Sequence, residues 1–297
     1  MVGEIAALAG AFTWALTTVL VKGPVSRMGA IAVNTIRTWV GAFVFLAILL
    51  ATGGIGELLA TPPQTALLLA LAIIVGLGIG DTLYFESVQL IGVSRALPIS
   101  GTYPLPTFAI TALWLGETIK PAYILGTALI VLAVYLTARP DKHGKLIGGL
   151  ARNKAEFRRG ILLSIVAALL WAGSTAVLKF AVGETDLVVA NTIRLPAAGL
   201  VLLFAARRRK GGLGIRATDL KTLGVVALTG VIGTALGSFL YLFAVVEAGA
   251  GRTAALNSVS PFFGAPLSLI FLKERIAPAV LVGTLLSVAG VWLLIFG

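Results

Sequence analysis

The chain has 297 residues, of which 58% are hydrophobic and 12% are charged, and its mean hydropathy is +1.03. Soluble domains carry roughly 25% charged residues, so this chain cannot cover itself with a wetted surface. Its formal charge is +11, but the basic residues are spread through short segments between apolar runs, which argues against nucleic acid as a partner. Composition and charge together indicate a membrane protein whose immediate partner is the lipid bilayer.

Apolar runs of about 20 residues recur along the chain, each long enough to cross roughly 30 Å of hydrocarbon as a helix. The runs show no strict alternation of apolar and polar residues, so helices are predicted in preference to barrel strands. The fold class is therefore an all-α membrane protein. The sequence predicts ten transmembrane helices, at about 3–22, 30–51, 64–91, 95–116, 121–138, 160–180, 187–206, 221–247, 252–272 and 277–296.

The sequence is also an internal repeat, because residues 34–37 (Asn-Thr-Ile-Arg) recur unchanged at 191–194, an offset of 157 residues. Without any gap, the same offset relates Trp14 to Trp171, Tyr84 to Tyr241 and Pro104 to Pro261. Two copies, 1–138 and 160–297, are thus expected on either side of a basic linker, 139–159. Since each copy has an odd number of helices, the copies should form two inverted five-helix repeats.

Most of the 23 lysines and arginines lie in the odd-numbered loops between predicted helices, above all in the linker 139–159. Basic loops stay on the cytoplasmic side of a membrane. We therefore expect a multi-pass protein of the plasma membrane with a cytoplasmic linker and both termini outside. The single histidine, His143, lies among the basic residues of the linker and is expected to be a solvated residue, not a metal ligand.

Four charged residues fall within apolar runs, where a charge costs several kcal/mol and is a functional candidate. Arg37 and Arg194 are equivalent in the two copies. Inversion should place them near opposite faces of the membrane, so we expect them not to share one central site. They are interpreted mainly as structural residues that snorkel or bond backbone carbonyls, with a role in gating as the alternative.

Asp81 and Glu86 break the symmetry, since their counterparts are Ser238 and Phe243. They are separated by about 140° around a helix and should not face the same cavity. A carboxylate in an apolar setting suits proton coupling or recognition of an amine, and the more central Asp81 is the preferred site residue. The alternative is a structural hydrogen bond to another helix. Glu86 is a second candidate for proton coupling or gating.

The fourth and ninth predicted helices are interrupted by prolines, including the equivalent Pro104 and Pro261. An internal proline frees a backbone carbonyl, and interrupted helices in corresponding positions of two halves point to a transporter's binding site. The substrate pathway is therefore predicted among helices three, four, eight and nine, unless the prolines only kink the helices for packing. Its expected residues are Asp81, Tyr84, Ser100, Tyr103, Ser238, Tyr241, Asn257 and Ser260, with Trp14 and Trp171 as walls or gates.

Three features of each half resemble a known family. A tryptophan in the first helix is followed by a lysine (Trp14 with Lys22, Trp171 with Lys179), and an arginine lies early in the second. The fourth helix has a central proline and ends near a glutamate, Glu117 or Glu274. Nearly the whole chain thus resembles the drug/metabolite transporter superfamily, EamA type. The resemblance implies a carrier of metabolites, amino acids or drugs that works by alternating access, commonly as an exporter.

Two other classes of function were weighed against a carrier. An intramembrane enzyme is disfavoured because the chain has no cysteine, no histidine in an apolar run and no Gly-x-Ser-x-Gly motif, and no Walker-type loop indicates ATP-driven pumping. No cofactor and no metal are expected. A channel stays open as an alternative. The prediction is a secondary active transporter for a small-molecule substrate, with proton coupling and efflux as further expectations.

Overall fold

The computed structural model describes residues 2–115, 121–138, 153–208, 212–273 and 278–296, and every regular element within these ranges is a helix. Seven helical segments in the described ranges are long and apolar enough to cross a membrane, judged by length and composition. The prediction of an all-helical membrane protein is confirmed. His143 and most of the basic linker lie outside the described residues.

Elements of the first half follow one another with short connections. They are α1 (Val2–Met28), α2 (Ala30–Thr52), α3 (Ile55–Ala60), α4 (Pro63–Ile73), η1 (Ile74–Gly80), α5 (Asp81–Ile91), α6 (Val93–Ser100), α7 (Pro104–Leu115) and α8 (Pro121–Ala138). Within this set, α4, η1 and α5 are consecutive parts of one long helix, Pro63–Ile91.

The second half has the same order of long elements. They are α9 (Lys154–Val182), α10 (Leu187–Arg207), η2 (Ile215–Ala217), α11 (Leu220–Thr229), η3 (Gly230–Leu236), α12 (Gly237–Ala248), α13 (Ala250–Asn257), α14 (Ser260–Leu272) and α15 (Pro278–Phe296). The offset of 157 residues superimposes α6 on α13 at both ends and gives α2 and α10 the same first position. Secondary structure therefore repeats along the chain together with the sequence.

Several helices extend beyond their predicted ends. The first was expected at 3–22 but continues to Met28 through Pro24, and the sixth, expected from 160, begins at Lys154. Hydropathy marks only the apolar part of a helix, whereas backbone hydrogen bonds and caps decide where it ends. Asn153 provides such a cap, because its side chain accepts a hydrogen bond of 2.9 Å from the Glu156 amide. The short helix α3 was not predicted.

Both long helices Pro63–Ile91 and Leu220–Ala248 change from α to π geometry near their middle, at η1 and η3. A π turn widens the helix and shifts backbone hydrogen bonds to i→i+5, so nearby carbonyls become available to other partners. At η1 the Asn34 amide supplies such a partner from α2, donating to the Leu77 carbonyl (2.8 Å) and to Thr82 Oγ1 (2.9 Å). The sequence analysis did not predict these π segments.

The two predicted helix interruptions are present at corresponding positions. In the first half α6 ends at Ser100 and α7 begins at Pro104. In the second half α13 ends at Asn257 and α14 begins at Ser260, directly before Pro261. A proline has no backbone N–H to donate, so it fits the first turn of the helix segment that follows each break.

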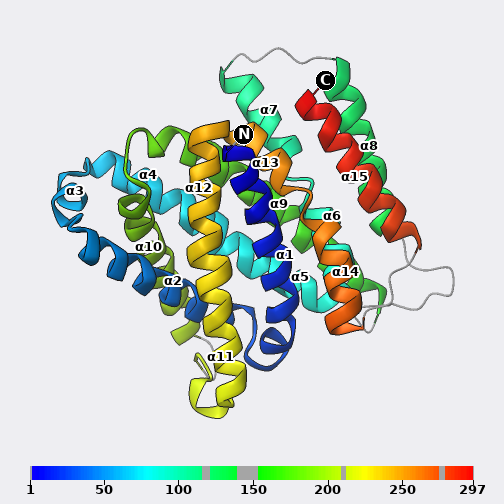
Figure 1. Cartoon of the computed structure of the whole chain (residues 1–297). Coiled ribbons are helices and arrows are strands. Elements are labelled where there is room, and N and C mark those ends of the chain that lie inside the picture. Colours follow the sequence, from blue (N-terminus) through cyan, green and yellow to red (C-terminus); the bar gives the residue numbers. More distant parts are fainter. Residues whose placement is uncertain (1, 116–120, 139–152, 209–211, 274–277, 297) are drawn as a thin grey trace.

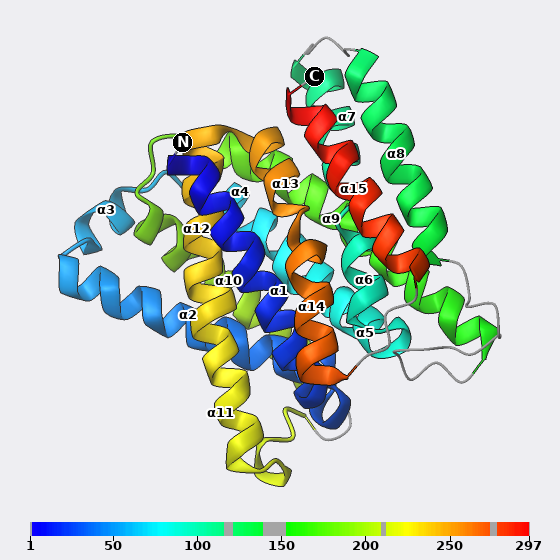
Figure 2. The same ribbon diagram turned by 45° about the vertical axis from the view of Figure 1, so that its right-hand side comes forward.

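Helices of the two halves interleave through the centre of the molecule. Figure 1 shows α1 beside α12 and α14 of the other half, and α9 packs in turn against α4, η1, α5, α6 and α7. The helices α2 and α10 pack on each other, and α8 and α15 form a pair at one edge of the molecule (Figure 2). The first helices of both halves therefore line the interior, where each faces elements of the other half.

Candidate functional site

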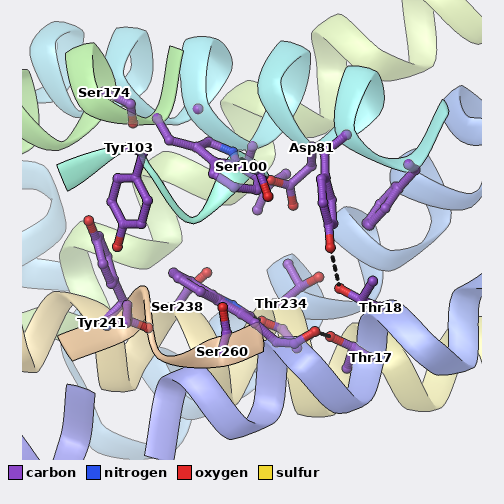
Figure 3. Close-up of a pocket in the computed structure, with 18 of the residues that line it drawn as sticks. Thr17, Thr18, Asp81, Ser100, Tyr103, Ser174, Thr234, Ser238, Tyr241 and Ser260 are labelled. Carbon is purple, nitrogen blue, oxygen red and sulfur yellow. Dashed lines mark hydrogen bonds between the residues drawn. The ribbon is translucent and has the colours of Figure 1, made fainter. Parts of the chain in front are cut away.

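A cavity of about 120 Å³ lies in the interior. Since one water needs roughly 10–15 Å³ of such a volume, the cavity has room for several waters or a small molecule. Its walls come from both halves, and they include every residue predicted for the substrate pathway: Trp14, Asp81, Tyr84, Ser100, Tyr103, Trp171, Ser238, Tyr241, Asn257 and Ser260. Figure 3 labels Asp81, Ser100, Tyr103, Ser238, Tyr241 and Ser260 of this set around the central space, together with neighbouring threonines and Ser174.

Arg37 and Arg194 also line this cavity, so the expectation that the two arginines could not share a central site is wrong. Both side chains are buried, at 3% and 4% exposure. The reason lies in the packing: α2 and α10 pack on each other, and each long arginine side chain reaches from its own helix into the cavity between the halves. Neither arginine snorkels to the surface.

Glu86 does not line the cavity. Its side chain, 39% exposed, forms an ion pair with Arg159 on α9. This pair joins the two halves by linking the middle of α5 to the first part of α9. A gating or proton-coupling role for Glu86 therefore stays a prediction, and it would have to act from outside the cavity.

The cavity wall contains two pairs of aromatic rings, and each pair consists of one ring from the first half and one ring from the second half. Trp14 lies 5.1 Å from Tyr241, and Trp171 lies 5.2 Å from Tyr84, measured between ring centroids. The two pairs are equivalent in the repeat, because the offset of 157 residues relates Trp14 to Trp171 and Tyr84 to Tyr241. Such ring pairs contribute about 0.5–1.5 kcal/mol beyond their buried area. The tryptophans thus join the halves directly across the cavity.

The indole N–H groups of the two tryptophans have different partners. Trp171 Nε1 donates to Asp81 Oδ1 at 3.0 Å. Trp14 Nε1 donates to the Gly233 carbonyl within η3 at 3.3 Å, because Ser238 stands where the first half has Asp81. The structural role that the sequence left open for Asp81, a hydrogen bond to another helix, is therefore present, in the wall of the cavity.

Glycines allow this close packing. A Cβ atom on Gly80 would lie 2.9 Å from the Trp171 indole, and one on Gly237 would lie 2.7 Å from Trp14 Nε1. Any larger residue at either position would push the tryptophan aside. These two glycines therefore serve packing, and through packing they position the rings.

Several buried polar atoms in the wall have no hydrogen-bond partner among the described residues. They include Asn257 Oδ1, the Tyr103 hydroxyl, Nε and Nη1 of Arg37 and Nε of Arg194. Buried polar groups are almost always paired in proteins, so unpaired atoms facing a cavity are positions for water or ligand. In Figure 3 Tyr103 and Tyr241 point toward each other at one end of the cavity, and the Tyr84 hydroxyl bonds Thr18 at the other.

The sequence analysis missed several polar positions, among them Thr18, Thr175 and Thr234 of the cavity wall. Thr17 and Ser174, related by the offset, line the cavity on α1 and α9. They lie three residues after the tryptophans, so they face the same side of the helix, and this spacing could have found them. Asn34, which bonds the π segment, belongs to the most obvious repeated motif of the chain, but its role depends on a π turn that no local pattern announced.

Only three charged side chains are among the lining residues: Arg37, Arg194 and Asp81. The described residues contain no group of three His, Cys, Asp or Glu side chains that could hold a metal ion. The chemistry offered is therefore recognition by two guanidinium groups, one carboxylate, hydroxyls and aromatic rings.

Comparison with known proteins places the chain in a family. The pattern of the EamA-like transporter family matches residues 1–139 and again 158–296. The chain thus belongs to the EamA-like transporter family, within the drug/metabolite transporter superfamily that its repeated residues resemble. An uncharacterised transporter of Archaeoglobus fulgidus is 25% identical over 99% of this chain and 98% of its own length. One crystal structure shares the fold over 97% of this chain and 96% of its own, with a TM-score of 0.66 and 19% identity.

Two shorter similarities carry more specific names. A protein of Streptantibioticus cattleyicolor named "Probable terminal-alkyne amino-acid exporter" is 25% identical over 42% of this chain and 41% of its own length. A protein of Lactobacillus johnsonii whose name assigns it to ribose uptake is 28% identical over 51% of this chain and 50% of its own. The chain spans about half of each of these two relatives. The family and these names indicate a transporter and not an enzyme.

Proposed function

We propose that this protein is a secondary active transporter that moves small metabolites across the membrane by alternating access. The observation that carries the proposal is the cavity, which is walled by both halves and holds buried polar atoms without partners. Secondary transporters place their substrate at the interface of two repeats, beside interrupted helices. The family membership and the paired breaks at Pro104 and Pro261 support the same function.

We further propose ten membrane crossings in two inverted repeats, 1–138 and 160–297, joined by a cytoplasmic linker. The seven long spans, the broken helix α6–α7 and the shorter apolar α8 and α15 support this number. Both ends of the chain lie toward the same end of the molecule in Figures 1 and 2, as an even number of crossings requires. The plasma membrane, with both termini outside, is the proposed location.

The proposed cargo is an amino acid or a related compound, and the proposed direction is export. The relative named as an amino-acid exporter supports this assignment. The mixture of charged and aromatic groups in the cavity wall suits an amino acid better than a sugar, since ribose has no charged group for Arg194 or Asp81 to bind. Drugs with the same charges belong to the same proposed class.

Asp81 is the proposed coupling residue. It is the only carboxylate among the lining residues, and it accepts a hydrogen bond from Trp171 of the other half. Protonation of Asp81 would weaken a contact between the halves, which links proton binding to their relative movement. Arg37, close enough to interact with it electrostatically, is the proposed partner that changes between access states.

Transport by Asp81→Asn tests this proposal. The purified full chain is placed in proteoliposomes with a panel of radiolabelled amino acids, with and without a pH gradient. We expect the variant to keep exchange of internal for external substrate and to lose accumulation driven by the gradient. Glu57→Gln, at an exposed carboxylate on α3 outside the cavity, is the matched control. Accumulation by Asp81→Asn equal to the wild type would remove Asp81 from coupling.

A channel is the alternative function, and the same vesicles distinguish it. A carrier binds substrate at one side of the membrane at a time. An excess of unlabelled substrate inside the vesicles therefore drives transient uptake of labelled substrate, and the rate of uptake saturates as the substrate concentration rises. A channel shows neither behaviour. We favour the carrier because the cavity lies between the two halves, where secondary transporters bind their substrate.

A further inference from the structure

The two arginines of the cavity stand in unequal surroundings, although the repeat makes them equivalent. Arg37 lies close enough to Asp81 for the two charges to interact, and its guanidinium packs over the Phe85 ring at 4.8 Å. The counterpart of Asp81 in the second half is Ser238, which lines the same cavity as Arg194. The first half therefore has a carboxylate at the position where the second half has a hydroxyl.

Arg194 is deeply buried and has few partners. Its exposure is 4%, and within the described part of the chain Nη1 donates a hydrogen bond of 2.9 Å to Asn191 Oδ1 on the same helix. Its Nε has no partner among the described residues. Arg194 takes part in none of the ion pairs among the described residues. Burying a guanidinium without a counter-ion costs free energy, and this cost is greatest inside a membrane.

The position of Ser238 indicates where a counter-ion of Arg194 would lie. Ser238 lies three residues before Tyr241 on α12, so the two side chains share a helix face. Arg194 is within electrostatic range of Tyr241, and all three residues line the cavity. Figure 3 shows Ser238 and Tyr241 on one side of the central space. The space that a carboxylate would take at position 238 is thus part of the cavity.

We infer that Arg194 binds a carboxylate group of the substrate, which stands beside Ser238 where Asp81 stands in the first half. The two guanidinium groups and one carboxylate of the wall carry one net positive charge, which a single substrate carboxylate neutralises. A guanidinium suits this group because its N–H donors match both carboxylate oxygens. The inference rests on the proposed transport function and adds the residue that selects for an acid.

The first test needs no substrate. An aspartate at position 238 would supply the counter-ion from the protein itself, whereas an asparagine of the same shape would not. We expect the purified Ser238→Asp variant to melt about 2 to 4 °C above Ser238→Asn, which corresponds to a modest gain for a chain of this size. A Ser238→Asp variant that melts at or below Ser238→Asn overturns the inference, whatever the protein transports.

The second test uses vesicles and matched probes: L-leucine, leucinamide without the carboxylate, 4-methylpentanoate without the amine, D-ribose and inorganic phosphate. We expect the wild type to exchange the probes with a carboxylate. In Ser238→Asp their affinity should fall about tenfold or more below the affinity of Ser238→Asn, which has a side chain of the same shape without the charge.

Each other outcome has a definite meaning. Equal exchange of leucine by the wild type and Ser238→Asp overturns the carboxylate site and leaves the transporter intact. Exchange of leucinamide, ribose or phosphate in preference to the carboxylates does the same. No exchange of any probe, with uptake that never saturates, counts against the carrier function, and the melting comparison still decides whether Arg194 lacks an anion.

Discussion

At the scale of single residues, identical side chains in the two halves have different partners. Trp14 and Trp171 occupy equivalent positions and pack on equivalent tyrosines. Only Trp171 donates to a carboxylate, that of Asp81, whereas Trp14 donates to a neutral backbone carbonyl. A hydrogen bond to a charged group contributes about 1.5–3 kcal/mol, compared with about 0.5–1.5 kcal/mol for a neutral pair.

We predict that Trp171→Phe lowers the melting temperature more than Trp14→Phe. Each substitution removes the same indole ring and leaves a phenyl ring in its place, so the difference reports on the partner of the N–H group. The measurement is thermal unfolding of the purified proteins in one detergent. In a protein that also carries Asp81→Asn, the fall in melting temperature caused by Trp171→Phe should become closer to the fall caused by Trp14→Phe. Equal losses in the wild-type background would contradict the charged hydrogen bond.

At the scale of elements, the π segments let helices of the two halves approach closely. Gly230 begins η3 where α2 crosses it. A Cβ atom at this position would lie 2.8 Å from the Val40 Cβ and 2.9 Å from the Arg37 carbonyl oxygen. Because one of these neighbours is backbone, a side-chain rotation cannot relieve the contact. The crossing of α2 and η3 therefore requires glycine.

We predict that Gly230→Ala destabilises the protein by about 1–3 kcal/mol, the usual cost of overpacking. The matched control is Gly224→Ala in the preceding helix α11, where an added Cβ meets nothing within 4 Å. Replacing that glycine should be neutral or stabilising by about 0.5–1 kcal/mol, since glycine weakens a helix. Chemical denaturation in detergent measures both. A Gly230→Ala protein as stable as Gly224→Ala would refute the tight crossing.

At the scale of the whole molecule, ion pairs join the two halves at the surface. Glu4 pairs with Arg252 at 3.0 Å, Arg27 pairs with Asp219 at 2.9 Å, and Glu86 pairs with Arg159. Exposed pairs of this kind contribute about 0–1 kcal/mol each. The contacts that hold the halves together are thus mainly the apolar and aromatic ones in the interior, and the surface pairs can exchange as the halves move.

The membrane orientation gives a prediction for the whole chain, and the absence of cysteine from the sequence makes it easy to measure. Ser26 and Glu184 are exposed, and the proposed topology places Ser26 inside the cell and Glu184 outside. A membrane-impermeant maleimide should label Glu184→Cys in intact cells and Ser26→Cys only after permeabilisation. The reverse pattern would invert the topology without altering the fold.

Much of the architecture and most of the candidate site were predictable from the sequence. Apolar runs, prolines and the 157-residue offset are local features, and they indicate helices, breaks and equivalent positions without reference to packing. The cavity residues Tyr103 and Asn257, for example, follow from the polar groups beside the breaks. The predicted helix ends were less accurate, because hydropathy does not register caps such as Asn153.

The amino-acid sequence by itself determined the helical class, the repetition and the residues around the broken helices, since each depends on short stretches of chain. The tertiary structure alone decided that Arg37 and Arg194 face one cavity, that Asn34 bonds a π segment, and that Asp81 is held by Trp171. Those contacts join helices that are separate elements of the chain, and two of the three involve both halves. A repeat in sequence makes two residues equivalent, but only the crossing of the helices decides which neighbours each of them meets.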